Sequence, residues 1–409
     1  MSQQRRYSAT IVYKQHFRRF LESAPGRLHF AAHSHHFWPD VTRDAVLAYW
    51  DDSARLADRK WSYLWTDVIP EARRKIARIL DLPAPEQLVF APNTHEFVNR
   101  LISCFESHKP IQILTTDSEF HSFRRQAKRL AEAGWANIVQ VPSEPIGDFS
   151  ERFAAASRAR DDYDLVYFSH VFYNSGLVVD PLARLVEDLP ERPVVVVDGY
   201  HSFCALPTSL RAIADRIFFI AGGYKYAQSG EGVCFMSVPR GCSLRPINTG
   251  WYADFGRLAA EHTETVMYSD DGMRFAGATF DVSGIYRMSA VLGLLAREGI
   301  EIADIHRHVQ GLQRRFIDGL AALGHPLLSR ERLCQHDLWH DNRHGDRPHG
   351  HFLTFVLPSV ADTEKLAEQL FGADVVVDHR GRRLRFGFGM YLDNGDVDEL
   401  LTRIAGLDG

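Results

Sequence analysis

The stretch over residues 194–232 constrains the fold most strongly, because it contains two short apolar runs. The first is a run of four valines that ends at Asp198, and the second, over 217–221, ends shortly before Lys225. Both runs are β-branched or aromatic and nearly free of polar residues, which is typical of strands covered on both faces of a parallel sheet. Ligands of such sheets bind beyond the carboxyl ends of the strands. Asp198 and Lys225 are therefore expected at a ligand site.

An aspartate and a lysine at neighbouring strand ends suit pyridoxal 5'-phosphate (PLP). The lysine amine forms a Schiff base with the aldehyde of PLP, and a buried aspartate keeps the ring nitrogen protonated so that the ring draws electrons. The spacing also fits a plainer interpretation, in which Asp198 caps a helix and Lys225 lies on the surface. Spacing alone does not decide between these two interpretations.

The segments that hold Asp198 and Lys225 carry a family resemblance. Asp198-Gly-Tyr-His201, followed by Gly-Gly-Tyr-Lys-Tyr-Ala-Gln-Ser-Gly-Glu-Gly over 222–232, resembles fold-type I PLP enzymes of the class V aminotransferase group, and among them we expect kynureninase to be most similar. The resemblance implies that Lys225 carries PLP and moves the Cα proton. It also implies that Asp198 pairs with the ring nitrogen and that His201 lies beside this aspartate.

Short apolar runs alternate with helical stretches from residue 51 to about residue 280. This alternation predicts an α/β fold with a mostly parallel sheet wrapped by helices, and we expect 232–239 to be its antiparallel edge strand. The resemblance implies the PLP-transferase fold of type I, with a sheet of the seven-stranded type. We expect an N-terminal arm and helix over 1–50 that pack with the small domain, and a large PLP-binding domain over 51–282. A long linking helix and a small α+β domain are expected over 283–409.

Thr94 and His95 follow an expected strand and begin an expected helix, for which Asn93 or Thr94 is a plausible N-cap. A capped helix explains these residues without any ligand. The resemblance instead implies that Thr94 and His95 bind the cofactor phosphate, since free N–H groups and the helix dipole favour an anion.

Phe120, Tyr173 and Tyr224 match aromatic positions of the family. Phe120 follows Glu119 and is expected to stack on the pyridine ring, with His121 as the reserve candidate and burial for packing as the alternative. Tyr173 falls near the phenolic oxygen of PLP, and Tyr224 directly precedes the lysine. The resemblance thus implies that these three aromatic residues contact the cofactor.

Trp251 and Thr279 lie in segments similar to the Gly-Trp and Arg-Phe-x-x-Gly-Thr motifs of the family. In related enzymes these segments come from the partner subunit and reach the phosphate or the substrate. The resemblance therefore implies a homodimer with the active site at the subunit interface. An exposed tryptophan otherwise most often serves packing.

The substrate side of the site is expected to include Arg385, His33 and Ser34. Arg385 falls on the arginine that binds an amino-acid α-carboxylate through two hydrogen bonds, and Asp378-His-Arg380 is similar to Asp-Tyr-Arg of kynureninase. The turn over 33–36 replaces a Gly-Asn-Ser-Leu-Gly-like turn, of which it keeps only Ser34. This departure leaves the substrate undetermined.

No metal site is expected. His33, His35 and His36 lack a carboxylate or thiolate partner at a usual spacing. The histidines between Cys334 and His351 are irregularly spaced in a stretch rich in Gly, Asp and Pro, which favours a solvated loop.

The composition excludes several kinds of partner. A net charge of −5 without a basic run argues against nucleic acid, and no apolar stretch is long enough to span a membrane. Five cysteines without a CxxC pair imply neither a disulfide framework nor a zinc ribbon. The cytoplasm is therefore the expected location.

The resemblance implies a PLP-dependent enzyme that acts on an amino acid through an external aldimine. The matches to kynureninase at Phe120, Tyr173 and Asp378-His-Arg380 favour kynureninase-like hydrolytic Cβ–Cγ cleavage that releases alanine. A class V aminotransferase or another PLP lyase stays open, because the first proton transfers are shared. A cysteine desulfurase needs a nucleophilic cysteine before Arg385, and residues 376–382 contain none. No helix-turn-helix extension or basic segment supports a non-catalytic regulator.

Overall fold

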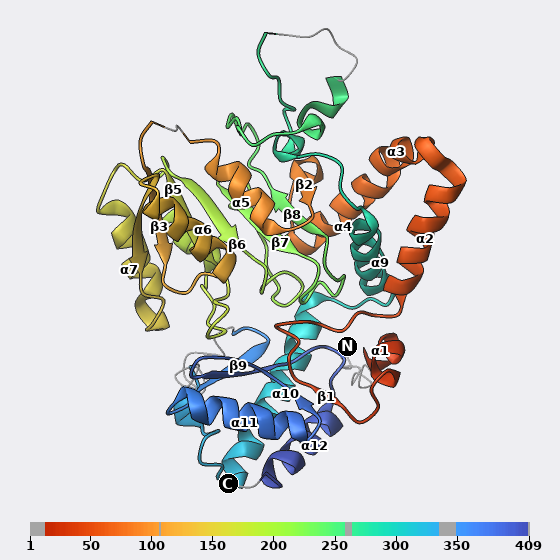
Figure 1. The fold of residues 1–409 in the computed structure, drawn as a ribbon, viewed down its shortest axis with the longest axis vertical. Coiled ribbons are helices and arrows are strands. Elements are labelled where there is room, and N and C mark those ends of the chain that lie inside the picture. Colours follow the sequence, from red (N-terminus) through yellow and green to blue (C-terminus); the bar gives the residue numbers. More distant parts are fainter. Residues whose placement is uncertain (1–12, 106–107, 258–263, 335–348, 408–409) are drawn as a thin grey trace, which may run out of the picture.

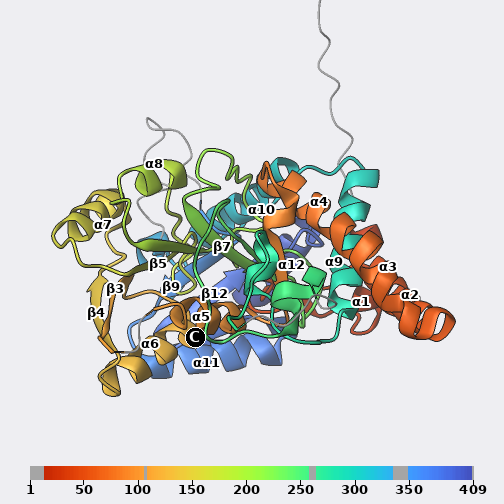
Figure 2. The same cartoon turned by 90° about the horizontal axis from the view of Figure 1, so that it is seen from above.

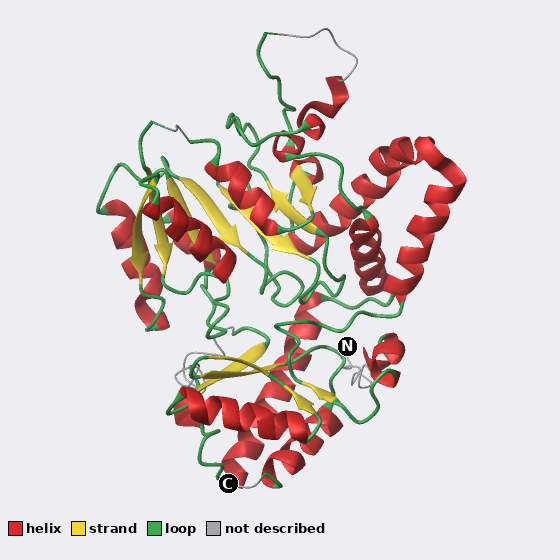
Figure 3. Ribbon diagram, in the orientation of Figure 1, coloured by secondary structure: helices red, strands yellow, loops and turns green. Residues whose placement is uncertain are grey.

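The structure is a computed structural model that describes residues 13–105, 108–257, 264–334 and 349–407 (Figure 1). A large sheet with its helices forms the upper part of the molecule in this view, and a smaller sheet with its helices forms the lower part. The ends of the described chain both lie in the lower part. Figure 3 shows the strands of both sheets in yellow and the helices around them in red.

The large sheet has seven strands: β2 (Leu88–Ala91), β3 (Ile111–Thr116), β4 (Ala136–Val141), β5 (Leu165–Ser169), β6 (Val194–Asp198), β7 (Ile217–Gly222) and β8 (Cys234–Ser237). Their order is β2-β8-β7-β6-β5-β3-β4. The strands from β7 to β4 run parallel to one another, whereas β8 is antiparallel to both β7 and β2. The prediction of a mostly parallel sheet is confirmed.

The expectation of an edge strand over 232–239 is wrong in one respect. β8 is antiparallel, but it lies between β7 and β2, so that β2 forms the edge. All residues of β2 and β8 are buried. The pairing of Ala91 with Cys234 joins segments that are far apart in the chain, and a local sequence pattern does not encode such a partner.

Helices cover both faces of the large sheet, as Figure 2 shows. Alternate residues of β6 and β7 contribute to two different apolar clusters: Val197 and Phe219 to one, Val196 and Phe218 to the other. Successive side chains of a strand point to opposite faces, so strands covered on both sides are apolar throughout. The covering helices are α5 (Thr94–Ile102) and α6 (His121–Glu132) on one face, and α7 (Phe149–Arg158) and α8 (Leu182–Glu187) on the other.

A group of helices stands beside the large sheet and contains α2 (Val41–Leu56), α3 (Lys60–Tyr63), α4 (Ile69–Leu80) and α9 (Ser283–Arg297). α9 packs against α2 and α4. The expected long linking helix is in fact two helices, because α9 ends before Gly299 and α10 (Ile302–Leu323) begins after it. Gly299 has a φ of 65°, a left-handed conformation that interrupts a helix and that glycine adopts readily.

The small sheet has the order β11-β12-β9, with β9 (Phe352–Val356), β11 (Asp378–Arg380) and β12 (Arg383–Gly387). The N-terminal arm joins this part through β1 (Leu28–His29), which pairs with β10 (Val375–Val376). Its expected first helix is a short 3-10 turn, Tyr13–His16, and then α1 (Arg18–Glu22). The helices α11 (Val360–Gly372) and α12 (Asn394–Ala405) complete the small part.

The remaining 3-10 turns are Ala57–Arg59, Pro85–Gln87, Ile146–Asp148, Trp251–Arg257, Gly272–Phe275 and Arg330–Arg332, and Leu64–Val68 is a π-helical turn. Among the described residues, no helix combines the length and the apolar character needed to cross a membrane.

The expected solvated loop over 334–351 is corrected at its C-terminal end. Residues 335–348 lie outside the described residues, but His349 and His351 are buried. His349 Nε2 lies 2.7 Å from Gln313 Oε1, and His351 Nε2 lies 3.0 Å from His306 Nδ1. These two histidines thus belong to the packing between α10 and β9.

Candidate active site

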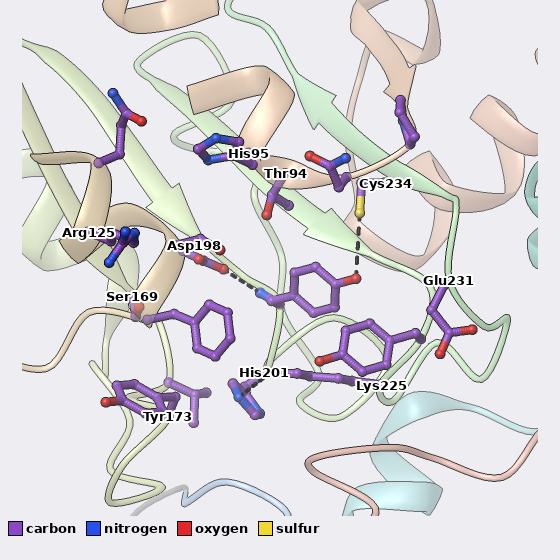
Figure 4. A pocket seen from close by; sticks show the side chains of 18 of the residues that line it. Thr94, His95, Arg125, Ser169, Tyr173, Asp198, His201, Lys225, Glu231 and Cys234 are labelled. Carbon is purple, nitrogen blue, oxygen red and sulfur yellow. Dashed lines mark hydrogen bonds between the residues drawn. The ribbon is translucent and has the colours of Figure 1, made fainter. Parts of the chain in front are cut away.

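A cavity of about 790 Å³ lies beyond the carboxyl ends of β5 and β6 (Figure 4). Ser169 ends β5, Asp198 ends β6, and Lys225 follows β7; all three line the cavity. Parallel strands end at the same edge of a sheet, so residues from three separate segments meet there. The start of α5 and one face of α6 form another part of the wall.

Lys225 is buried in the wall of this cavity and lies against His201. Its Nζ atom is 2.6 Å from Nε2 of His201. Burial lowers the pKa of Lys225 to about 7, and burial also lowers the pKa of His201 well below its ordinary value. A large fraction of the lysine amine is therefore neutral near pH 7, as a nucleophile requires.

Both carboxylate oxygens of Asp198 accept hydrogen bonds from the protein. The backbone N–H of Tyr200 donates to Oδ1 at 2.9 Å, and the hydroxyl of Tyr167 donates to Oδ2 at 3.0 Å. Burial raises the pKa of Asp198, and these two hydrogen bonds oppose the rise. Tyr167 in turn stacks on Phe123 of α6 with ring centroids 3.6 Å apart. The carboxylate thus has a fixed orientation.

Our sequence reasoning missed Tyr167. The available signal is that Tyr167 and Ser169 are the two hydroxyl-bearing side chains of the otherwise apolar strand β5, which pairs with the strand that ends in Asp198. The hydrogen bond itself depends on the register between β5 and β6, which pairs Tyr167 with Val196.

Glu119 is a second buried carboxyl group near Asp198. It accepts hydrogen bonds from the hydroxyl groups of Thr116 and Ser169, each at 2.6 Å, and from the backbone N–H of Ser169. Burial raises the pKa of Glu119 to about 8 despite these donors. Glu119 therefore connects β3 to Ser169 in the cavity wall.

Aromatic side chains surround the lysine. The Phe120 ring is 39% exposed and lines the cavity, with its centroid 5.2 Å from Lys225 Nζ. Phe120 makes an edge-to-face contact with Tyr173 at 5.6 Å. Tyr224 also lines the cavity, with its ring centroid 5.8 Å from the same Nζ. Phe120 is thus a partly exposed ring in the cavity wall, where a stacking partner is expected, whereas its reserve candidate His121 is not among the cavity-lining residues.

The structure brings most of the expected cofactor residues together. Thr94 and His95 line the cavity at the start of α5, where Asn93 is the N-cap and accepts the N–H of Glu96 at 3.0 Å. Trp251 and Thr279 do not line the cavity of this single chain, and both are exposed. Their expected contribution from a partner subunit stays a prediction.

Arg385, His33 and Ser34 are not among the cavity-lining residues either. Arg385 is buried and donates through Nη1 to the carbonyl oxygen of Tyr173 at 2.6 Å. His33 is buried beside Asp378, with its Nε2 atom 3.6 Å from Oδ2. The expected substrate role of these residues also stays a prediction.

A family model described as aminotransferase class V matches residues 38–339. The chain belongs to the class V aminotransferase family. This match confirms the resemblance to the class V group, although not the finer resemblance to kynureninase. It also confirms PLP as the cofactor and a PLP-dependent enzyme as the class of protein.

The proteins similar to this class V enzyme are named for several different reactions. Isopenicillin N epimerase of Amycolatopsis lactamdurans is 31% identical over 46% of this chain and 47% of its own length, so the chain spans about half the length of this relative. Kynureninase of Shouchella clausii is 23% identical over 63% of this chain and 61% of its own, and several cysteine desulfurases are 20–24% identical. Kynureninase is thus one distant relative among several.

Solved structures support the fold. The cystine C-S lyase C-DES in complex with cysteine persulfide has a TM-score of 0.78 with this class V chain, at 18% identity, over 95% of this chain and 100% of that one. At this identity the likeness shows the fold alone. The expectation of PLP-dependent fold type I is confirmed.

The residues of the cavity fit PLP. A buried, partly neutral lysine is available for the aldehyde, and an oriented buried carboxylate is available for the ring nitrogen. The partly exposed Phe120 ring lies beside them, and a capped helix start offers an anion site. When bound, PLP supplies an electron sink for charge that develops on the substrate.

Proposed function

We propose that this class V enzyme acts on an α-amino acid with an aromatic side chain and cleaves that side chain hydrolytically with release of alanine, as kynureninases do. The observation that supports the proposal is the aromatic wall formed by Phe120 and Tyr173 beside Lys225. Aromatic side chains prefer such edge-to-face and offset contacts, so an aryl group fits this wall.

The chain's own residues supply proton transfer and binding. Lys225 moves the proton at Cα of the substrate, and His201, whose Nε2 lies 2.6 Å from Nζ, is hydrogen-bonded to the amine and fixes its position. Arg385 binds the α-carboxylate of the substrate by charge-assisted hydrogen bonds. PLP contributes the electron sink in this scheme.

The cysteines do not support a desulfurase, although desulfurases are among the relatives. Of the five cysteines, Cys234 lines the cavity, and burial raises its pKa to about 12. Cys334 lies in the small part and accepts a hydrogen bond from Arg383 Nη1 at 2.8 Å, and burial raises its pKa to about 11. A nucleophilic cysteine must be a thiolate, so neither residue suits that chemistry.

Transamination is the second candidate, and the description of the matching family favours it. It uses the same lysine and the same carboxylate contact, but it leaves the amino group on the cofactor until an oxo-acid arrives. The two reactions therefore differ in their products and in the final state of the cofactor.

Incubation of the PLP-loaded protein with L-kynurenine or 3-hydroxykynurenine tests the proposal. We expect an anthranilate and alanine without an added oxo-acid. Accumulation of the amine form of the cofactor without anthranilate would instead support transamination. The variant Cys334→Ala should keep full turnover, because this thiol takes no part in the proposed reaction.

We further propose that the enzyme is a homodimer in which Trp251 and Thr279 complete the partner's site. Both residues are exposed in the single chain, which suits a contact made between subunits. Mixed dimers of Lys225→Ala and Thr279→Ala subunits should regain one intact site, whereas each variant alone stays impaired. Failure of the mixture to regain turnover would exclude the shared site.

A further inference from the structure

The ion pair between Asp378 and Arg385 is built into the small sheet. The two residues are direct partners in the antiparallel ladder of β11 and β12, and Oδ2 of Asp378 accepts a hydrogen bond from Nη2 of Arg385. Residues directly opposite each other in such a ladder have neighbouring side chains. The backbone itself therefore holds the carboxylate beside the guanidinium.

Arg385 keeps N–H donors for a ligand, because its guanidinium has five and the described contacts use two. Nη1 donates to the carbonyl oxygen of Tyr173 at 2.6 Å, and Nη2 donates to Asp378. Nε is buried and has no hydrogen-bond partner among the described residues. An unsatisfied buried donor of a charged group is costly, so Nε is available to a carboxylate from outside the chain.

Asp378 has two further neighbours, of which Arg380 is hydrogen-bonded to it and His33 is in contact without a hydrogen bond. Nη1 of Arg380 donates to Oδ1 at 3.0 Å, and Nε2 of His33 lies 3.6 Å from Oδ2. The His33 ring stacks on Phe352 with centroids 4.8 Å apart. His33 comes from the N-terminal arm, so the arm and the small sheet meet at this carboxylate.

Gly387 allows this arrangement. It lies two residues after Arg385 on β12, and a Cβ atom at this position would lie only 2.1 Å from Nδ1 of His33. Any other residue at 387 would displace the His33 ring from its place beside Asp378.

The charges of this cluster match one carboxylate. Arg380 and Arg385 carry two positive charges and Asp378 carries one negative charge. Burial lowers the pKa of His33 to about 4, so His33 is neutral at pH 7. The net charge is thus one positive unit, which a single substrate carboxylate would neutralise. A buried guanidinium without a counter-charge is strongly destabilising, so the Arg385 side chain also needs the Asp378 carboxylate in the folded protein.

We propose that Asp378 is a positioning residue that orients Arg385 for the substrate carboxylate, with the His33 ring packed beside Asp378. This inference rests on the proposed carboxylate-binding role of Arg385. Since Asp378 is fixed by the β-ladder and by Arg380, it stays beside Arg385 when the substrate binds and does not compete with it.

The test compares two ligands of the PLP-loaded protein that differ only in the carboxylate. L-Alanine and ethylamine are titrated while the absorbance of the cofactor is followed. In Asp378→Asn, we expect the dissociation constant of alanine to rise roughly tenfold, the scale of one hydrogen bond to a charged group, and that of ethylamine to change less than twofold. The matched control is Glu144→Gln, which removes an exposed carboxylate that Arg383 Nη2 contacts on the same strand β12; it should change neither constant.

Unchanged or tighter binding of alanine by Asp378→Asn would overturn the proposal, and tighter binding would identify Asp378 as a competitor. The variant Arg385→Lys distinguishes a failure of the positioning role of Asp378 from a failure of the proposed carboxylate-binding role of Arg385. If Arg385→Lys leaves alanine binding unchanged, the carboxylate role of Arg385 fails. If Arg385→Lys weakens alanine binding and Asp378→Asn does not, only the positioning role fails.

A second variant covers the case in which Asp378→Asn does not fold. His33→Asn keeps the Asp378–Arg385 pair and removes only the ring that the arm packs beside Asp378. We expect a smaller loss, roughly threefold, again confined to alanine. Equal losses for alanine and ethylamine would show a general disturbance of the site and would overturn the proposal.

Discussion

The hydroxyl of Tyr167 donates a hydrogen bond of 3.0 Å to Oδ2 of Asp198, and this contact joins the parallel strands β5 and β6 at the edge that borders the cavity. Tyr167 therefore stabilises the ionised carboxylate and fixes its direction.

Tyr167→Phe should weaken PLP binding, because Asp198 loses one of its two hydrogen-bond donors and its pKa rises further. We expect the dissociation constant of PLP to rise roughly fivefold, equivalent to about 1 kcal/mol. Equilibrium dialysis and cofactor absorbance measure the change. Tyr286→Phe is the matched control, since its hydroxyl also donates to an aspartate, Asp52, at 3.0 Å, outside the residues that line the cavity. Equal effects of the two variants would contradict a specific role of Tyr167.

The pH dependence of cofactor capture should follow Lys225. Because burial lowers the pKa of Lys225 to about 7, the neutral amine fraction rises through neutral pH and is nearly complete about one pH unit higher. The rate of PLP uptake by the cofactor-free protein should rise with pH and then level off in this range. After borohydride reduction, mass spectrometry should find the cofactor on Lys225, and Lys225→Ala should carry none. A rate that keeps rising up to pH 10 would contradict the lowered pKa.

The raised pKa of the Glu119 carboxyl group should make the free energy of unfolding decrease as pH rises. The pKa of Glu119 is about 8 in the folded protein and about 4.5 without the surrounding structure. Between these values the folded state holds a proton that the unfolded state has lost, so the free energy of unfolding decreases with pH across this window.

Glu119→Gln removes this ionisation. Between pH 5 and pH 8 the free energy of unfolding of this variant should therefore fall by less than that of the wild type, and the two falls should differ by up to a few kcal/mol. Urea unfolding at a series of pH values provides the measurement. Glu71→Gln, an exposed residue of α4, is the control and should retain the wild-type slope. The same slope in Glu119→Gln would show that this carboxyl group ionises normally.

Gly230 should be essential for the contact between the N-terminal arm and the loop after Lys225. Its φ is 69°, and a Cβ atom would lie 2.4 Å from the Trp38 ring. Gly230→Ala should lower the free energy of unfolding by about 2–3 kcal/mol, from backbone strain and overpacking together. Gly232→Ala shares the positive φ but has open space around the new Cβ, so it should cost only about 1 kcal/mol. Thermal unfolding of both variants separates the two contributions, and equal losses would exclude the Trp38 contact as a cause.

The expectations that the structure confirms rest on local patterns. The valine run before Asp198 predicts a strand covered on both faces, and its residues do alternate between two apolar clusters. Asn93 is the N-cap of α5, because a short polar side chain before an apolar helix face satisfies a free N–H group. Each of these features depends on neighbours within a few residues.

The expectations that failed concern partners far apart in the chain. The position of β8 within the sheet depends on pairing with β2, and the break between α9 and α10 places the two helices in different parts of the molecule. The burial of His349 and His351 depends on packing against α10. Apolar periodicity reports that a segment is buried, but it does not report which segment covers it.

The sequence by itself determined the α/β class of the fold, the buried strands that end near Asp198 and Lys225, and the helix start at Thr94, because strand burial and helix capping are encoded by adjacent residues. Only the tertiary structure decided that His201 lies against Lys225, that Tyr167 orients Asp198, and that His33, Asp378 and Arg385 form one cluster. These contacts depend on strand register and on the docking of the N-terminal arm, and both arise when distant segments pack together.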